Sequence, residues 1–478
     1  MYIHHLRVEN LKRLKDFALD FTHRDQPRMW TVLIGENGTA KTTLLQAIAL
    51  AAAGYKEVSG LAGATVKHLR DRRDEELMSI DATFAFGPRS LAGGRTLHPL
   101  LPLPRGRKPK GLLLRSGVSL EAGSTSLDAK AFYRGAPPKK RSSDDPLAEA
   151  RATNTPLWFV AGYGISRALP DASETPTLAR PSIERLEPLF RQKRPASTGF
   201  ANHFLEKDRR EGRKLGYTSR RFSRMLKQAV RLGGADLFPS LARFELRGQG
   251  GALSHGYQST FAWVADLIGH VLLESKTEID TTEMEGLVLI DEIDLYLHPT
   301  WQASFVPALR RVFPRMQFVA TTHSPIVLSS LAPHEIVRLV VDEETGNIVQ
   351  GGWPRDGGQF RPGIQDAEHQ PDPRPMTGGE LYRTWFGLEG LTPNPLGEKL
   401  RRLQILSTHP APTTTQQREL NQLRGAVAKK LIQNLGATEG RKAFEELEAS
   451  HGSKASARTG RAPAHRQPGG AQPTRGTG

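Results

Sequence analysis

The chain has 478 residues, enough for one large domain or for two domains. It contains no cysteine, which excludes disulfide scaffolds, thiolate zinc sites and cysteine nucleophiles and agrees with a reducing cytoplasm. A net charge of +16, a hydrophobic content of 38% and no apolar run of about 18 residues predict a soluble protein with polyanionic partners such as nucleic acid.

The first predicted lobe, residues 1–60, contains a candidate phosphate-binding loop. Residues 1–21 alternate like edge strands, and an apolar strand at residues 29–34 runs into GENGTAKTT and then a helical stretch. In that context backbone N–H groups and the helix N-terminus can bind phosphate. Lys41 would reach the β- and γ-phosphates and Thr42 would bind Mg²⁺. A chance glycine-rich turn is the alternative.

The usual spacing of such a loop, G-x-x-x-x-G-K-[ST], is met here with one substitution. Gly35 opens the motif and Lys41 and Thr42 close it, but Ala40 stands where the second glycine is usual. An alanine at a position that often needs a positive φ costs about 1 kcal/mol. The loop is therefore expected to form with some backbone strain.

The next region, residues 61–180, is predicted to hold sheet strands interrupted by basic loop insertions. Strand patterns occur around residues 78–86 and at residues 157–163. Between them lie Pro- and Gly-rich pieces with basic clusters at residues 105–111 and 137–141. Such a composition predicts long surface loops.

Residues 181–235 form a predicted basic helical insertion. Thirteen Lys and Arg stand against three acids between Arg191 and Arg231. A solvated helical face is one explanation. A surface that follows phosphates is the other, and four interleaved aromatic residues favour it: Phe200, Phe204, Tyr217 and Phe222. About five phosphate contacts would give a log–log salt slope near −4 to −5. The nucleic-acid candidates are Arg209, Arg210, Arg213, Lys214, Arg220, Arg221 and Arg224.

The second lobe, residues 236–355, contains the segment GLVLIDEIDLYLHP. Its apolar residues 287–290 predict a strand buried on both faces, which ends on Asp291 and Glu292. Open α/β sheets bind ligands at the carboxyl edge of their strands. One acid there can hold Mg²⁺ and the next can orient or deprotonate a water. A pair of solvated loop acids is the alternative.

Two short segments of the same lobe suit a phosphate ligand. LSHGYQS, residues 253–259, puts a serine and a glycine at the start of an apolar helix, where they offer donors to an anion. This placement makes sense if the loop caps a triphosphate bound by a second copy. His323, in TTHSP, follows a buried strand, where a neutral imidazole could hydrogen-bond a γ-phosphate. By itself it would be an ordinary loop histidine.

The order of these motifs resembles that of ABC-type ATPases. The sequences IDEIDLYLHPTWQ and ATTHSP are similar to those of the RecF/OLD/SMC branch. The resemblance covers residues 1–340 in blocks. It implies an α/β ABC-ATPase head, with a mixed sheet of parallel core and antiparallel edge, a basic helical insertion and a helical carboxyl-terminal extension. In that branch two heads dimerise around two ATP molecules.

The resemblance also implies roles for individual residues. Glu292 would position the attacking water, Asp291 would bind Mg²⁺ together with Thr42, and His323 would be the switch histidine. Ser254 and Gly256 would reach the γ-phosphate held by the partner. The implied ATP-binding set is Gly35, Asn37, Gly38, Ala40, Lys41, Thr42, Thr43, Ser254 and Gly256.

Three departures from the family pattern predict slow turnover. Ala40 replaces a glycine. His255 replaces the small residue that is usual in the family's signature loop, which corresponds here to residues 253–259. There is no glutamine between Gln46 and Gln192, so the family's Mg²⁺-contacting glutamine has no counterpart. Slow hydrolysis would suit a nucleotide-gated switch better than a motor.

The carboxyl-terminal part is predicted as a linker (residues 356–378), a helical partner-binding extension (379–451) and a disordered basic tail (452–478). GGELYRTWFGLEG and the charged helical stretch after it resemble bacterial antiphage ATPases of the Septu and retron-associated type, which act beside a separate nuclease subunit. No D-x-D cluster follows residue 340, so no nuclease site of the TOPRIM type is expected in this chain.

Together these observations predict a cytoplasmic ATPase that dimerises on ATP, binds or senses DNA or RNA, and regulates a partner nuclease or other effector in antiphage defence. One alternative is a RecF-like repair ATPase without an effector. The other is a scaffold whose ATP is structural. No membrane partner is expected. The trigger, the effector and the stoichiometry beyond a dimer of heads stay open.

Overall fold

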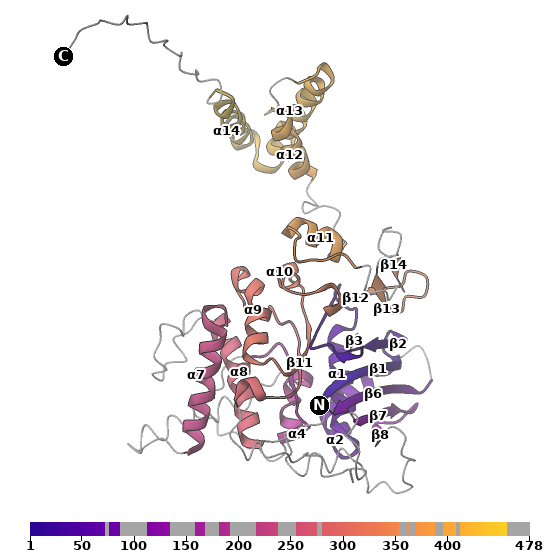
Figure 1. The fold of residues 1–478 in the computed structure, drawn as a ribbon. Helices are drawn as coiled ribbons and strands as arrows, with labels where there is room; N and C mark the ends of the chain where they lie inside the picture. Colours follow the sequence, from indigo (N-terminus) through magenta and orange to yellow (C-terminus); the bar gives the residue numbers. More distant parts are fainter. Residues whose placement is uncertain are drawn as a thin grey trace, which may run out of the picture. The chain divides into compact units, whose positions relative to one another are not determined.

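The computed structural model describes residues 1–71, 76–86, 112–133, 158–167, 181–191, 217–237, 255–274, 280–352, 361–362, 370–387, 395–407 and 412–456. The chain divides into two compact units, Met1–Gly387 and Leu388–Gly478. Figure 1 traces both along the sequence. The predicted basic loop clusters, Ser254 and the residues beyond 456 lie outside the described part.

The first unit is built on two sheets. A five-stranded antiparallel sheet has the order β2-β1-β6-β7-β8, and a seven-stranded sheet has the order β14-β13-β12-β5-β11-β10-β9. In the larger sheet the strands from β12 to β9 are parallel and the last two, β13 and β14, are antiparallel. The predicted α/β fold, with a parallel core and an antiparallel edge, is confirmed.

The strands of the smaller sheet are β1 (Tyr2–Leu11), β2 (Leu14–Asp20), β6 (Met78–Phe86), β7 (Leu112–Leu120) and β8 (Asp128–Tyr133). Those of the larger sheet are β5 (Trp30–Gly35), β9 (Val160–Tyr163), β10 (Gly286–Ile290), β11 (Met316–Thr321), β12 (Ile336–Val341), β13 (Ile348–Gly352) and β14 (Arg361–Pro362). A short ribbon joins β3 (Thr22–His23) to β4 (Gln26–Pro27).

Two hydrophobic cores lie on opposite faces of the larger sheet. Leu287 and Leu289 of β10 belong to the core shared with the smaller sheet, and Val288 and Ile290 belong to the other core. This alternation follows from the period of two in a strand. The helix α1 (Lys41–Ala53) contacts strands of both sheets, so it lies in the first core. A strand buried on both faces explains the continuous apolar run in the sequence.

The second core is covered by helices. The helix α7 (Tyr217–Leu237) packs against α8 (His255–Glu274) and α9 (Pro299–Val312), and the three lie side by side in Figure 1. Leu381 and Trp385 of α11 belong to the same core. The other α-helices in the described part of this unit are α2 (Tyr55–Ala62), α4 (Pro181–Glu184), α5 (Glu187–Phe190), α10 (Pro325–Leu328) and α11 (Gly378–Phe386).

Two predictions about the middle of the chain are wrong. The stretch that holds β7 and β8 was expected to be loop, yet both strands pair in register with β6 and with each other. The aromatic ring of Phe222, expected on a nucleic-acid surface, is only 6% exposed and packs in the second core. In both cases the outcome depends on packing between residues far apart in the sequence, which a local pattern does not specify.

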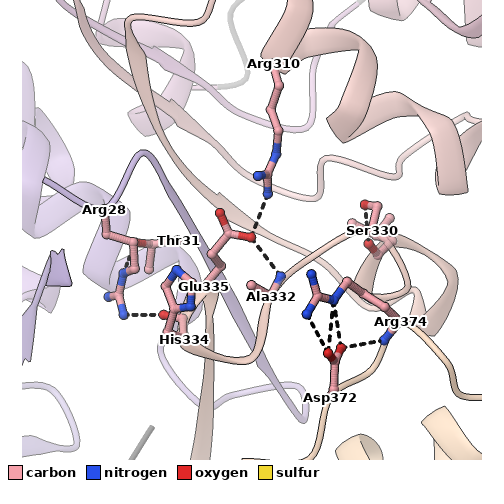
Figure 2. A network of polar contacts seen from close by, with 10 residues as sticks. Arg28, Thr31, Arg310, Ser330, Ala332, His334, Glu335, Asp372 and Arg374 are labelled. Atoms are coloured by element: carbon pink, nitrogen blue, oxygen red, sulfur yellow. Dashed lines mark hydrogen bonds and ion pairs between the residues drawn. The ribbon is translucent and has the colours of Figure 1, made fainter. Parts of the chain in front are cut away.

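Figure 2 shows a polar network around the first residues of β5 and those that precede β12, at the amino edge of the larger sheet. Arg28 donates to the carbonyl oxygen of His334 at 2.6 Å and to Thr31 Oγ1 at 2.9 Å. Arg310 of α9 pairs with Glu335 at 2.6 Å. Burial lowers the pKa of Arg28 to about 10, against the raising effect of nearby Glu335 and Asp20. The network ties β5, β12 and α9 together and so fixes strands that carry the site.

The described part of the second unit is helical. Its helices are α12 (Pro395–Ser407), α13 (Thr414–Leu435) and α14 (Ala437–Ser456). Leu403, Leu406, Leu420 and Val427 form a small core of their own. Gly436, at φ 88°, separates α13 from α14 within the predicted helical extension. Among the helices described, none is long and apolar enough to cross a membrane.

Candidate nucleotide site

Three strands of the larger sheet bring the predicted motifs to one edge. The phosphate loop follows β5, the acidic pair follows β10, and Thr321 ends β11, which lies between them in the sheet. Thr42 Oγ1 donates to Asp291 Oδ2 at 2.7 Å, and Thr321 Oγ1 donates to Asp291 Oδ1 at 2.7 Å. Each carboxylate oxygen of Asp291 therefore accepts one hydrogen bond, Oδ2 from the end of the phosphate loop and Oδ1 from the end of β11.

The phosphate loop closes around its own lysine. Lys41 Nζ donates to the carbonyl oxygens of Gly35, at 2.8 Å, and Glu36, at 2.9 Å. Burial lowers the pKa of Lys41, while nearby Asp291, Glu292 and Glu36 act in the opposite direction. A Cβ on Gly35 would lie 2.4 Å from the carbonyl oxygen of Leu339 in β12, so the loop can leave the sheet here only at a glycine. A phosphate ligand can replace the two carbonyl contacts of the lysine.

Ala40 has the backbone conformation that its position in the motif predicts. Its φ of 60° and ψ of 21° lie in the left-handed region, and it directly precedes α1. Alanine is strained there by about 1 kcal/mol because its Cβ crowds the following carbonyl oxygen. The first helical residues, Lys41 to Thr43, place their amides at the N-terminus of a 13-residue helix. Such an N-terminus favours an anion.

The turn after β10 is fixed by residues that the sequence analysis gave no role. Glu292 has φ 49°, which is uncommon for a residue with a side chain. Its amide donates to Thr321 Oγ1 at 2.7 Å, and its carbonyl oxygen accepts from Arg167. The same guanidinium group donates to the carbonyl oxygen of Asp291. Thr321 is the last residue of β11 and Arg167 lies four residues past β9, so no local pattern marks either of them as part of this turn.

The segment TTHSP holds His323 between two anchored neighbours. Thr322 Oγ1 donates to Asp294 Oδ1 at 2.5 Å, and Ser324 Oγ donates to Gln302 Oε1 at 2.5 Å. Thr322 is fully buried, whereas His323 is exposed. The imidazole is therefore presented to solvent from a fixed backbone just past the end of β11.

The oxygen atoms at this edge suit Mg²⁺. Thr42 Oγ1 and Asp291 Oδ2 are 2.7 Å apart, and both are hard oxygen donors. Mg²⁺ in phosphate sites takes one or two protein oxygens and completes its shell with waters and phosphate oxygens. Within the described ranges no group of three or more His, Asp or Glu side chains is arranged to hold a metal ion.

Of the other predicted residues, Asn37 and Gly38 lie in the phosphate loop itself, and the rest lie on α7 and α8 or outside the described ranges. Gly256 is the second residue of α8, so the predicted signature loop does lead into a helix, while Ser254 itself is not described. On α7, Arg220 and Arg224 are exposed and Arg221 is partly buried. Arg209, Arg210, Arg213 and Lys214 are not described.

Two family models match the chain. One, "AAA ATPase domain", matches residues 1–154, and the other, "AAA domain, putative AbiEii toxin, Type IV TA system", matches residues 137–329. Septu protein PtuA of Bacillus mycoides is 24% identical over 436 residues, which are 90% of this chain and 50% of that protein. "Retron Ec83 probable ATPase" of Escherichia coli is 39% identical over 84 residues, 18% of this chain and 16% of that protein.

This chain is related to the Septu and retron ATPases. The resemblance predicted from the motifs is therefore confirmed. The chain spans about half the length of the Bacillus mycoides relative and a smaller share of the others. Among solved structures, the SMC head domain from Thermotoga maritima is 14% identical, with a TM-score of 0.35 over 73% of this chain and 99% of that chain.

Proposed function

We propose that this chain binds Mg²⁺ and ATP at the carboxyl edge of the larger sheet and hydrolyses the ATP slowly. The observation that carries the proposal is the 2.7 Å hydrogen bond between Thr42 and Asp291, residues 249 positions apart in sequence. It puts the end of a phosphate loop against an acid at the tip of a buried strand. Phosphate-transferring sites need this pairing to hold a metal ion beside the phosphates.

Each residue of the edge then has a task. Lys41 exchanges its carbonyl contacts for the β- and γ-phosphates, and the amides that open α1 bind phosphate oxygens. Thr42 and Asp291 hold Mg²⁺, which when bound neutralises charge on the transferring phosphate. Glu292 orients or deprotonates the attacking water, and His323 contacts the γ-phosphate.

Turnover is proposed to be slow. Ala40 strains the phosphate loop, and the family's Mg²⁺-contacting glutamine has no counterpart in the sequence. Both affect how well the γ-phosphate, the metal and the water are aligned. Misalignment by about 1 Å can lower a rate about 100-fold. Slow hydrolysis leaves the nucleotide-bound state populated for long enough to act as a signal.

ATP is proposed to join two copies at this edge. Two exposed apolar side chains flank the site: Tyr296, after β10, is 56% exposed and Ile165, after β9, is 43% exposed. Tyr296 also has φ 67°, a strained conformation for an aromatic residue. A second copy would cover both side chains and bring its Ser254 and Gly256 to the γ-phosphate.

The proposed ligand of α7 is nucleic acid. Arg220, Arg224, Lys227 and Arg231 are all exposed, and their spacing of four, three and four residues puts them on one face of the helix. The opposite face packs in the second core through Phe222, Met225, Leu226 and Ala229. A row of cations on a rigid helix can follow a phosphate backbone.

The proposed setting is antiphage defence, in which nucleotide state controls a separate effector, such as a nuclease. This part of the proposal is supported by the relatives, named Septu protein PtuA and retron ATPases. The helical second unit, with its own small core, is the proposed effector-binding part.

The dimer of heads is tested with Glu292→Gln, which is expected to bind ATP but not to hydrolyse it. Light scattering after gel filtration should show a dimer with ATP and Mg²⁺ and a monomer without nucleotide. Lys41→Ala is the matched control and should stay monomeric because it cannot hold the triphosphate. A monomeric Glu292→Gln protein at saturating ATP would contradict the dimer.

The same samples separate the alternatives when DNA and the product of the neighbouring gene are added. A stable complex with slow, DNA-responsive hydrolysis supports the defence switch. No complex, but hydrolysis that DNA accelerates with a steep salt dependence, supports a repair ATPase. ATP that co-purifies and is never hydrolysed supports a scaffold.

A further inference from the structure

Arg167 is a buried cation beside the acidic pair. It follows β9, which pairs in parallel with β10, so its backbone lies next to the turn that carries Asp291 and Glu292. Its side chain is 2% exposed. In the described part of the chain its hydrogen bonds all go to carbonyl oxygens, those of Gly164, Asp291 and Glu292. The guanidinium therefore joins two strand ends through their backbones.

Moving this charge out of water costs free energy, which hydrogen bonds and nearby opposite charges must offset. Burial lowers the pKa of Arg167 to about 10, and the raising effects come from Asp291, Asp294 and Glu292, in that order. A guanidinium retains its charge under these conditions. Arg167 thus places a fixed positive charge beside the turn that carries the two carboxylates, where its hydrogen bonds to the backbone carbonyl oxygens hold that turn.

The backbone of Glu292 is held on both sides. Its amide donates to Thr321 and its carbonyl oxygen accepts from Arg167, while its φ of 49° is one that the chain would not adopt without such support. The direction of the Glu292 side chain is set by this backbone conformation. Loss of either contact allows the turn to relax toward a more common φ and swings the carboxylate away.

We propose that Arg167 is a positioning residue of the nucleotide site, which acts through Glu292 to align the attacking water. The inference rests on the proposed ATPase function. It assigns to Arg167 a part in hydrolysis and none in nucleotide affinity, because none of its contacts reaches the phosphate loop.

The test is a kinetic comparison of Arg167→Lys and Arg167→Gln with the wild-type chain. Both variants should lower kcat by about 10- to 100-fold, as expected for a misplaced catalytic group. The Kd for ATP, measured with a fluorescent analogue, should change less than about twofold. A merely structural role would lower the melting temperature without this separation of kcat from affinity.

Arg185→Lys is the matched control. Arg185 is also buried, at 3% exposed, and donates to a carbonyl oxygen of the same strand, that of Val160, but away from the acidic pair. Its pKa is likewise lowered to about 10 by burial. Arg185→Lys should therefore lose stability to a similar extent and keep its kcat per folded molecule.

A double-mutant cycle tests whether Arg167 acts through Glu292. Residual hydrolysis is followed over hours with labelled ATP in Glu292→Ala and in Arg167→Lys combined with Glu292→Ala. The second change should have no further effect once the carboxylate is gone. An equal fold-loss in both backgrounds would overturn the proposal, as would a wild-type kcat in the folded Arg167 variants. A wild-type chain without any hydrolysis would instead overturn the proposed function itself.

Discussion

At the scale of single residues, the strain at Ala40 gives a direct prediction. Ala40→Gly should stabilise the fold by up to about 1 kcal/mol, because glycine adopts φ 60° freely, although its greater freedom in the unfolded chain offsets part of the gain. Thermal unfolding should show a rise of roughly 1 °C. Ala47→Gly, in the middle of α1, is the control and should destabilise by about 1 kcal/mol. Equal losses in both variants would contradict a left-handed Ala40.

His270 provides a prediction about pH. It is 1% exposed on α8, 3.5 Å from Asp266, and burial lowers its pKa to about 4 although Asp266 acts in the opposite direction. Its folded pKa therefore lies below the unfolded value near 6.5. As the pH falls from 6.5 to 4, the unfolded chain gains a proton that the folded chain does not, so the free energy of unfolding decreases.

The free energy of unfolding should decrease by about 1.4 kcal/mol per pH unit between pH 6.5 and 4, on the order of 3 kcal/mol in all. Above pH 7 this dependence should vanish, because His270 is then neutral in both states. Urea unfolding at pH 7, 6 and 5 measures it as the difference between the wild type and His270→Asn, which cannot titrate. Parallel pH dependences in the two proteins would contradict a buried neutral histidine.

The residues proposed to contact phosphate and Mg²⁺ can be recognised in the sequence, and those that hold the acidic pair cannot. Lys41, Thr42 and Asp291 occur in motifs whose spacing is imposed by the ligand, so a local pattern reveals them. Thr321 and Arg167 belong to the site only because β11 and β9 flank β10 in the sheet. Strand order is a long-range property that one sequence does not display.

At the scale of elements, the two faces of α7 are predicted to have different functions. The buried face stabilises the fold, and the exposed face binds DNA. Phe222→Ala should destabilise the fold by about 3–5 kcal/mol, since the ring lies in the second core. Arg220→Ala, on the exposed face, should change stability by less than about 0.5 kcal/mol and lower the salt slope of DNA binding by about 1. Urea unfolding and salt-titrated anisotropy measure the two effects. DNA affinity unchanged in Arg220→Ala at low salt would contradict the basic face.

The strands β7 and β8 show what sequence patterns miss at this scale. The segment LLLRSGVSL of β7 has a glycine in its middle and follows a Pro-rich stretch, so it resembles a loop. Its strand conformation is set by pairing with β6, nine residues in register from Met78 to Phe86. The hairpin of β12 and β13, by contrast, has a local turn signal in ETGN between two apolar runs, so a local pattern is enough to indicate it.

At the scale of the whole molecule, all described contacts of the nucleotide site lie within the first unit, Met1–Gly387. The antiparallel sheet and α1 support one face of the larger sheet, and α7 to α9 support the other. The site therefore sits at the edge of a sheet whose two faces are fully packed. Motion on ATP binding is expected at the loops of that edge and between copies of the chain, while the packed layers stay rigid.

We propose above all that this edge of the sheet hydrolyses ATP, with Glu292 orienting the attacking water. The most direct test follows phosphate release and retained ATP in the same samples of wild type, Glu292→Gln and Lys41→Ala. We expect slow phosphate release by the wild type, intact ATP retained by Glu292→Gln, and neither phosphate release nor retained ATP with Lys41→Ala. Phosphate release by Glu292→Gln at the wild-type rate, or a wild type that binds no ATP, would contradict it.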